Sequence, residues 1–363
     1  MQRQSEVDLV KDLTSLLFAE ATQKGIPLGG TFELTPLCNM NCKMCYIRMT
    51  KEERDRKGRE RTAEEWLDLA RQAKEQGMLF LLLTGGEPFL YKDFWYLYEE
   101  LKKMGLLVSI NSNATMLQGE ILEKLIKNPP VRINITIYGG SDKTYADLCR
   151  CPDGYTRATE AVRKLREAGV AVKINGSITP QNCDDIIECF DFAKEMDTLC
   201  QLGSYMFPPT RRDDVSTARF TAEEAGIYQA KIDKMRYEPQ DLAAIIAENE
   251  RCDREGSRKD YPQKFRCRAG KSGFWITWKG EMTGCGMMEK FYEHPFEDGF
   301  AECWKRLHKT ISEQTVLTAC KDCEQRDICK VCPAMALAET GDFNKKPQYI
   351  CQMNEAWKKE LCK

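Results

Sequence analysis

Residues 37–46 have the sequence LCNMNCKMCY, which places Cys38, Cys42 and Cys45 within eight residues. The segment follows a β-rich run at residues 31–35, so we expect the three thiols on a loop at the carboxyl end of a strand. A [4Fe–4S] cluster takes four cysteine ligands, so three thiolates would leave one iron free to bind another molecule. A zinc site with a distant fourth ligand and chance packing are the alternatives for this spacing.

β-rich runs and helix-patterned segments alternate beyond this loop. The runs lie at residues 79–84, 106–110, 131–137, 170–178 and 202–207, and the helical segments at residues 63–76, 92–104, 119–127, 155–168 and 184–195. Repeated strand–helix–strand units form right-handed crossovers on a parallel sheet. Six units are too few for a closed eight-fold barrel, so the pattern predicts an α/β fold with a partial (β/α)6 TIM-like barrel. Its chemistry is expected at the carboxyl ends of the strands.

The length of 363 residues favours two domains or one domain with an appendage. We expect an N-terminal helix within residues 1–28, the partial barrel at residues 29–207 and a polar helical connector at residues 208–262. Residues 263–363 are rich in cysteine, and we find few long periodic segments between residues 267 and 351. That region is predicted to be a small domain that folds around metal.

The composition restricts the class of protein. The formal charge is −2, which disfavours a nucleic-acid partner, and no run of 18 apolar residues is long enough to span a membrane. Because the N-terminus lacks an apolar signal segment, we expect a cytoplasmic protein. Eighteen cysteines in a reducing compartment more often bind metal or perform redox chemistry than form disulfides.

A second motif follows the run at residues 79–84. It consists of Gly85, Gly86, Glu87 and Pro88, in which the glycines allow close approach of the backbone and the glutamate can accept a hydrogen bond from an ammonium group. C-x3-C-x2-C followed one strand unit later by GGEP resembles the radical S-adenosylmethionine (SAM) superfamily. The resemblance implies that the three cysteines hold a [4Fe–4S] cluster with an open iron site. It also implies that the GGEP segment binds the methionine amino group of SAM.

Further positions match the superfamily less specifically. The resemblance implies that Ser112 and Asn113 contact SAM and that Arg150 binds its carboxylate. Met44 stands where an aromatic residue is usual, and its thioether can cover the adenine. Cys149 and Cys151 flank Arg150 and either fill the core or donate hydrogen to a substrate radical.

The C-terminal thiols have a recurrent spacing. Twelve residues separate Cys267 from Gly280, and four more separate Gly280 from Cys285; Cys320-x2-Cys323-x5-Cys329-x2-Cys332 and then Cys351 follow. This pattern resembles the SPASM extension of radical SAM maturases, with two residues instead of three between Cys329 and Cys332. A zinc ribbon is the alternative for Cys320 to Cys332, since two C-x2-C pairs make a tetrahedral site.

The resemblance implies two auxiliary [4Fe–4S] clusters. Cys320, Cys323, Cys329 and Cys351 would bind the outer cluster, and Cys267, Cys285 and Cys332 the inner one. The inner cluster then lacks one ligand: either Cys252 supplies it, or the site is open to a substrate thiolate or amide. Gly286 follows Cys285 at the position where sulfatase-maturing relatives have an acidic base, which counts against that activity.

These features predict an enzyme that cleaves SAM reductively to a 5′-deoxyadenosyl radical and oxidises a substrate C–H bond. A precursor peptide that receives a thioether or carbon–carbon crosslink is the preferred substrate. The alternatives are an epimerase or alcohol dehydrogenase acting on a peptide or a small molecule, and a zinc-stabilised binding protein without catalysis. We expect a flavodoxin- or ferredoxin-like electron donor, and recognition of the leader either by a separate protein or by the rim of the barrel.

Overall fold

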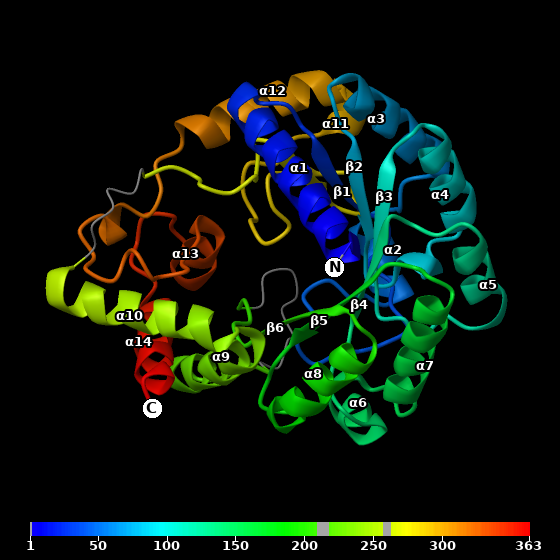
Figure 1. Ribbon diagram of the computed structural model, residues 1–363. Helices are drawn as coiled ribbons and strands as arrows, with labels where there is room; N and C mark the ends of the chain where they lie inside the picture. The colour runs from blue at the N-terminus through cyan, green and yellow to red at the C-terminus, as the bar shows by residue number, and fades with distance from the viewer. Residues whose placement is uncertain (1, 209–217, 257–262) are drawn as a thin grey trace. The chain divides into compact units, whose positions relative to one another are not determined.

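The computed structural model describes residues 2–208, 218–256 and 263–363 (Figure 1). Contacts group the chain into two compact units, each assembled from segments far apart in the sequence. The first contains Met1–Pro36, Lys51–Ser109 and Lys264–Gln314, and the second contains Leu37–Thr50, Ile110–Gln263 and Thr315–Lys363. These limits do not coincide with the boundaries expected after residues 28, 207 and 262, because long-range contacts that no local pattern reveals bring the segments together.

The first unit contains a mainly parallel sheet. β1 (Gly29–Glu33) lies between β2 (Phe80–Thr84) and β7 (Gly273–Ile276), parallel to both, and β8 (Met282–Thr283) is antiparallel to β7. β3 (Leu107–Ser112) begins beside β2, where Leu107 N donates to Leu79 O at 2.8 Å. β7 and β8 were not predicted from the sequence, because they are only four and two residues long.

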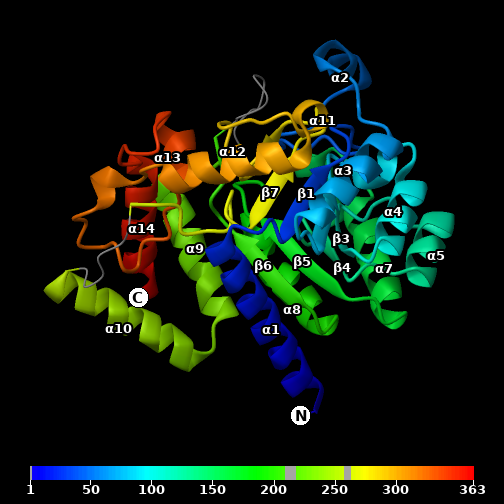
Figure 2. The same cartoon turned by 90° about the horizontal axis from the view of Figure 1, so that it is seen from above.

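The helices of the first unit lie before, between and after these strands. They are α1 (Gln2–Lys24), α2 (Lys51–Lys57), α3 (Ala63–Glu75), η1 (Pro88–Leu90), α4 (Phe94–Lys103), α11 (Pro295–Asp298) and α12 (Phe300–Glu313) (Figure 2). A capping box between Thr62 and Glu65 fixes the first turn of α3. The start of the helix in turn sets which of its faces is buried against the sheet. There the buried Trp66 ring stacks on Phe32 at 4.7 Å. Phe32 therefore points toward the helices.

The second unit continues the parallel βα pattern. After the end of β3 come β4 (Arg132–Thr136), β5 (Val172–Ser177) and β6 (Leu199–Gly203), which pair in that order. The intervening helices are α5 (Gly119–Lys127), α6 (Asp142–Cys149), α7 (Gly154–Glu167), η2 (Cys183–Asp185) and α8 (Ile186–Glu195). The α/β fold with parallel strands is thus confirmed.

Five further helical segments complete the second unit. They are α9 (Ala222–Arg236), α10 (Pro239–Glu255), η3 (Thr318–Cys320), α13 (Pro333–Thr340) and α14 (Gln348–Leu361). α9 packs closely on α14, as Figure 1 shows: a side chain on Gly226 would come within 2.3 Å of Met353 O. Between residues 267 and 351, where we expected few long periodic segments, α12 is a helix of 14 residues. Among the described residues, no helix is long and apolar enough to cross a bilayer.

Candidate active site

The first cysteine of the three-cysteine loop is fixed by the end of β3. Asn113 Nδ2 donates to Asn39 Oδ1 at 3.0 Å and to Cys38 Sγ at 3.6 Å. Asn113 Oδ1 accepts from the backbone N and the hydroxyl of Thr115, at 2.9 and 2.6 Å. Asn39 Nδ2 in turn donates to the Thr115 hydroxyl at 2.8 Å. Asn113, which was expected to contact SAM, therefore also positions Cys38 on the loop.

Ser112 and Thr115 shape the turn that carries Asn113. Ser112 is buried, and its hydroxyl accepts a hydrogen bond from Ala114 N at 2.9 Å. This bond supports a left-handed backbone at Ala114, with φ of 61°. The sequence analysis missed Asn39 and Thr115, although the polar run around Asn113 was a signal for them.

The remainder of the loop lies against the end of α6. Asn41 N donates to Cys149 O at 3.0 Å, and Lys43 N donates to Leu148 O at 2.9 Å. The side chains of Cys42 and Cys149 form a hydrogen bond, which together with burial holds the pKa of the Cys42 thiol well above its ordinary value. Without metal this thiol therefore stays protonated, and binding to iron must displace the proton.

The predicted ligands share one packed group with aromatic and sulfur-containing side chains. Its buried members are Met40, Cys42, Tyr145, Leu148, Cys149, Cys151 and Ala218, and the partly buried ones are Cys38, Met44, Cys45, Tyr138 and Tyr155. All three loop cysteines and Met44 thus occur in one environment. This donor set of three thiols on one loop fits the requirement of a [4Fe–4S] cluster with one open iron.

Arg150 ends α6 in a left-handed conformation, with φ of 57° and ψ of 37°. Its side chain is exposed, and its backbone N–H donates to Tyr145 O. The structure therefore shows a helix-ending role, and binding of the SAM carboxylate by Arg150 stays a prediction. Cys151 is buried, with its thiol directed to Asp153 Oδ1 at 3.7 Å.

The GGEP segment lies in the first unit, directly after β2. A side chain on Gly85 would come within 2.5 Å of Thr35 O, and Gly86 N donates to that oxygen at 2.7 Å. Gly85 is therefore needed for the close pairing of the loops that follow β1 and β2. Pro88 begins η1, and the buried Glu87 carboxylate caps it by accepting from Phe89 N at 3.5 Å.

The four cysteines predicted to bind the outer auxiliary cluster come together in the second unit. Cys320 and Cys323 interact electrostatically with each other and with Cys351, and Cys351 and Cys323 both interact with Cys329. Burial raises the pKa of the Cys329 thiol to about 11. Cys320 in η3 and Cys351 in α14, about 30 residues apart in the sequence, therefore lie near each other. A cluster with ligands from both elements requires this arrangement.

The cysteines predicted to bind the inner cluster are divided between the two units. In the first, Cys267 is exposed and Cys285 is half-buried. Their segments meet where a side chain on Gly284 would lie 3.0 Å from Gly270 N. In the second, Cys332 caps α13, its Sγ accepting from Met335 N at 3.4 Å.

Gly286 is buried beneath the indole of Trp275. A Cβ at this position would lie 2.7 Å from the ring, so an acidic side chain does not fit without rearrangement. Trp275 Nε1 donates at 3.1 Å to Glu33, a fully buried carboxylate at the end of β1 that the sequence analysis missed.

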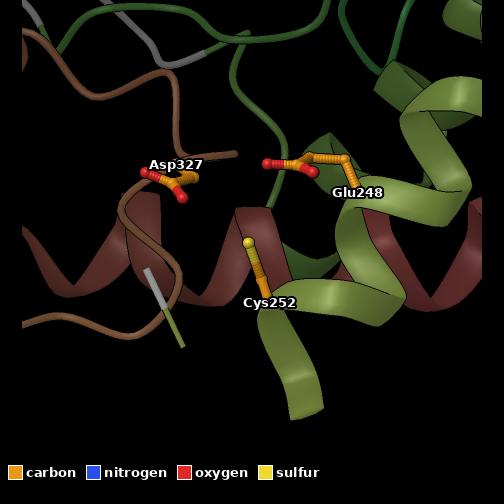
Figure 3. Close-up of side chains that lie close together, drawn as sticks. All are labelled: Glu248, Cys252 and Asp327. Carbon is orange, nitrogen blue, oxygen red and sulfur yellow. The ribbon is translucent and has the colours of Figure 1, made fainter. Parts of the chain in front are cut away.

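Cys252 lies in a group organised around the Arg251 guanidinium. One guanidinium nitrogen, NH2, contacts Cys252 Sγ at 3.2 Å, Glu248 Oε1 at 2.8 Å and Asp327 Oδ2 at 2.7 Å. The Cys252 sulfur and one carboxylate oxygen each of Glu248 and Asp327 lie within 4.8 Å of one another. Figure 3 shows these side chains converging from α10 and from the loop that carries Asp327. A positive charge of this chain already occupies the point where they converge, which favours an ion-pair group over a metal site.

Replacement of Cys252 tests whether it supplies the missing ligand of the inner cluster. We expect Cys252→Ala to leave the iron and sulfide content of the reconstituted protein unchanged, because the thiol is held by Arg251. Iron and sulfide analysis against the parent protein measures this. Cys332→Ala is the matched comparison, and a loss of iron in Cys252→Ala as large as in Cys332→Ala would show that Cys252 is a ligand.

Comparison with known proteins identifies the class to which this fold and site belong. Residues 32–193 match the model of the radical SAM superfamily, a range that includes the three-cysteine loop, GGEP and the end of β3. Residues 32–193 therefore form a radical SAM domain, and the chain is an enzyme. Such a domain binds a [4Fe–4S] cluster and SAM.

The relatives are distant and cover most of the chain. An AdoMet-dependent heme synthase of Methanosarcina barkeri is 26% identical over 88% of this chain and 94% of its own length. The sporulation killing factor maturation protein SkfB of Bacillus subtilis is 24% identical over 76% of this chain and 64% of its own. A PqqA peptide cyclase of Granulibacter bethesdensis is 23% identical over 88% and 85%.

Two solved structures share the fold. Streptococcus suis SuiB with bound S-adenosylmethionine matches with a TM-score of 0.65 at 19% identity, covering 90% of this chain and 78% of SuiB. Native anSMEcpe with bound AdoMet matches with a TM-score of 0.67 at 15% identity, covering 93% and 97%. The partial-barrel architecture is confirmed by these likenesses.

The residues present fit the expected cofactors, and their roles follow from their positions. When bound, the cluster and SAM supply an electron and a reactive carbon radical for hydrogen abstraction. Cys38, Cys42 and Cys45 would hold the cluster, and the Asn113 network keeps Cys38 in place. The apolar and sulfur-rich packing around Cys42 excludes water from this side of the loop.

Proposed function

We propose that the enzyme oxidatively modifies a ribosomally made precursor peptide, forming a thioether or carbon–carbon crosslink, and uses two auxiliary [4Fe–4S] clusters. The observation that carries the proposal is the gathering of Cys320, Cys323, Cys329 and Cys351 in the second unit. A second redox centre gives a place for the electron that a substrate radical must lose in a net two-electron oxidation. By the resemblance to the SPASM extension, Cys267, Cys285 and Cys332 would bind the inner cluster.

The relatives support a peptide as substrate. SkfB is a maturation protein, and several of the similar proteins are PqqA peptide cyclases. One SuiB structure that shares this fold, with a TM-score of 0.66, holds the precursor peptide SuiA. A peptide epimerase is the alternative within this substrate class.

The proposal includes roles for flanking residues and partners. By the resemblance to the superfamily, Gly85, Gly86, Glu87 and Pro88 would bind the amino group of SAM. Ser112, Asn113, Met44 and Arg150 would each contact the cofactor. Cys149 and Cys151 remain the candidate hydrogen donors. A flavodoxin- or ferredoxin-like protein would supply the electron, and a separate protein would recognise the leader; the exposed helix α2, in which no residue is buried, is a candidate docking element for the donor.

A tetrapyrrole is the second candidate substrate. The heme synthase of M. barkeri aligns with this chain over 94% of its own length, whereas SkfB aligns over 64% of its own length. Both substrate classes fit an enzyme with an auxiliary redox centre, so substrate identity must be measured directly.

Substrate-dependent SAM cleavage distinguishes the two candidates. Reconstituted enzyme, SAM and dithionite are incubated with cysteine-containing peptides or with a tetrapyrrole, both iron-loaded and iron-free, and 5′-deoxyadenosine and substrate mass are measured. We expect a peptide to stimulate cleavage and lose two hydrogen atoms, as a crosslink requires. Modification of the tetrapyrrole alone would contradict the peptide proposal.

A further inference from the structure

We infer that Glu339 accepts the proton that the substrate loses when a crosslink forms. The inference rests on the proposed function, because such an oxidation needs one acceptor for an electron and another for a proton. Gly286 stands at the position of the acidic base in sulfatase-maturing relatives, so the proton acceptor must come from elsewhere in the chain.

Glu339 is bound from the carboxyl end of the last barrel strand, within the second unit. β6 ends at Gly203, parallel to β5, and Tyr205 stands just beyond that end. The fully buried Ser204 fixes the backbone here, because its hydroxyl donates to Ala225 O at 2.6 Å. The carboxyl ends of parallel strands carry the chemistry of barrel enzymes. Tyr205 is therefore held at the edge of the sheet where substrates are expected.

A second segment joins Glu339 to the surroundings of the three-cysteine loop. Ala218 is 3% exposed and belongs to the packed group that contains the three loop cysteines. The next residue in the chain, Arg219, forms an ion pair with the Glu339 carboxylate. Glu339 is therefore bound by the direct neighbour of a residue that packs among the predicted cluster ligands.

Two donors hold one oxygen of this carboxylate and leave the other available. Tyr205 OH donates to Glu339 Oε1 at 2.7 Å, and the Arg219 guanidinium donates to the same oxygen. The guanidinium lies 3.6 Å from the centre of the Tyr349 ring, which fixes it in turn. In the part of the chain that the structure describes, Glu339 Oε2 has no hydrogen-bond partner. A carboxylate held by one oxygen is oriented to accept a proton on the other.

The neighbouring phenol acts as a hydrogen-bond donor and does not compete for the proton. Burial and the hydrogen bond to Glu339 hold the pKa of Tyr205 well above its ordinary value, so its hydroxyl stays protonated. Arg219 has donor groups only. Since the Glu339 side chain is 9% exposed, little bulk water competes for the carboxylate. Of these three side chains, Glu339 alone can accept a proton.

The step balances when a cysteine of the peptide is the nucleophile. A hydrogen atom has by then left a substrate carbon for the 5′-deoxyadenosyl radical. The cysteine sulfur bonds to that carbon, the S–H bond breaks, and its proton passes to Glu339 Oε2. One electron leaves for an oxidised iron–sulfur centre, which is reduced. The peptide has then lost two hydrogen atoms in all, and Glu339 returns its proton to water.

Replacement of Glu339 with glutamine tests the inference. The amide oxygen of Glu339→Gln still accepts from Tyr205 and Arg219, so the unfolding midpoint should stay parental, but the side chain takes up no proton. A peptide deuterated at carbon reports hydrogen abstraction as deuterium in 5′-deoxyadenosine, and its mass reports the crosslink. We expect abstraction at the parental rate and crosslinking slowed by at least about 100-fold, the lower end of what a general base contributes.

Two further variants complete the test. Glu223→Gln, which changes an exposed carboxylate of α9, should behave like the parent protein. In Glu339→Ala, formate can occupy the space of the lost carboxylate, so crosslinking should rise with formate concentration, which a purely structural role does not produce. Crosslinking by Glu339→Gln at the parental rate, equal loss of abstraction and crosslinking, or absence of rescue by formate would overturn the inference. A parent protein that crosslinks no peptide would contradict the proposed function itself, and the inference with it.

Discussion

Simultaneous replacement of Cys38, Cys42 and Cys45 with alanine is expected to remove one cluster, about four irons per chain, and to abolish formation of 5′-deoxyadenosine. The cause is the loss of all three thiolates that the loop offers to the cluster. Without the cluster, SAM has neither the open iron that binds it nor the electron that cleaves it. Iron analysis, the paramagnetic spectrum of the reduced protein and chromatography of the SAM products measure the effect.

The control for this variant is Cys362→Ala, because Cys362 is an exposed thiol at the C-terminal end of the chain. It should retain parental iron content and SAM cleavage. The loop variant must also keep the unfolding midpoint of the metal-free parent protein, which separates loss of the cluster from loss of the fold. Continued 5′-deoxyadenosine production by a folded loop variant would show that the cluster is bound elsewhere.

The alternation of the barrel elements could be predicted because its signals are local. Residues 119–127 were predicted as a helix and form α5 with the same limits, and the run at residues 79–84 became β2 at Phe80–Thr84. The strand expected at residues 202–207 instead lies at Leu199–Gly203, since pairing with β5 fixes it there. Register against a neighbouring strand is a tertiary constraint that hydrophobicity alone does not contain.

The elements missed by the sequence analysis depend on long-range contacts. β7 pairs with β1 across some 240 residues, and its few residues carry little local signal. The apolar periodicity of α14 was not recognised, because one of its partners is a polar residue of another helix. Trp357 packs against the fully buried Asp233 of α9, and Trp357 Nε1 donates to Asp233 Oδ2 at 2.9 Å. A buried carboxylate on a polar helix pattern gives no indication of its partner.

The contacts of the candidate site also depend on segments that are far apart in the sequence. Motif spacing was enough to propose Cys38, Cys42 and Cys45 as ligands, because a cluster demands thiols at short intervals. It could not reveal that Asn113 binds Cys38 or that Cys149 contacts Cys42, since those contacts join the loop to β3 and α6. The two glycines of GGEP were expected to let the backbone approach a ligand closely. The sequence did not indicate that Gly85 also gives space to the backbone of Thr35.

Replacement of Cys320 and Cys323 with alanine is expected to separate SAM cleavage from product formation. Both thiols belong to the group that also contains Cys329 and Cys351, and neither lies on the three-cysteine loop. The variant should therefore lose about four irons, retain substrate-independent 5′-deoxyadenosine formation, and yield no oxidised product. The electron of the substrate radical then has no acceptor, so the radical is expected to be quenched by a hydrogen atom from an exchangeable donor.

The measurement that makes this result informative is deuterium incorporation. In heavy water, a quenched substrate radical acquires deuterium from an exchangeable donor, so recovered substrate should become heavier while product is absent. Cys200→Ala is the control, because Cys200 lies in β6 outside the group. If the Cys320 and Cys323 variant forms product at the parental rate, these two thiols hold no redox centre that the reaction needs. Parental iron content together with bound zinc would instead identify a structural zinc site, because four thiolates can hold that ion in a closed tetrahedral geometry.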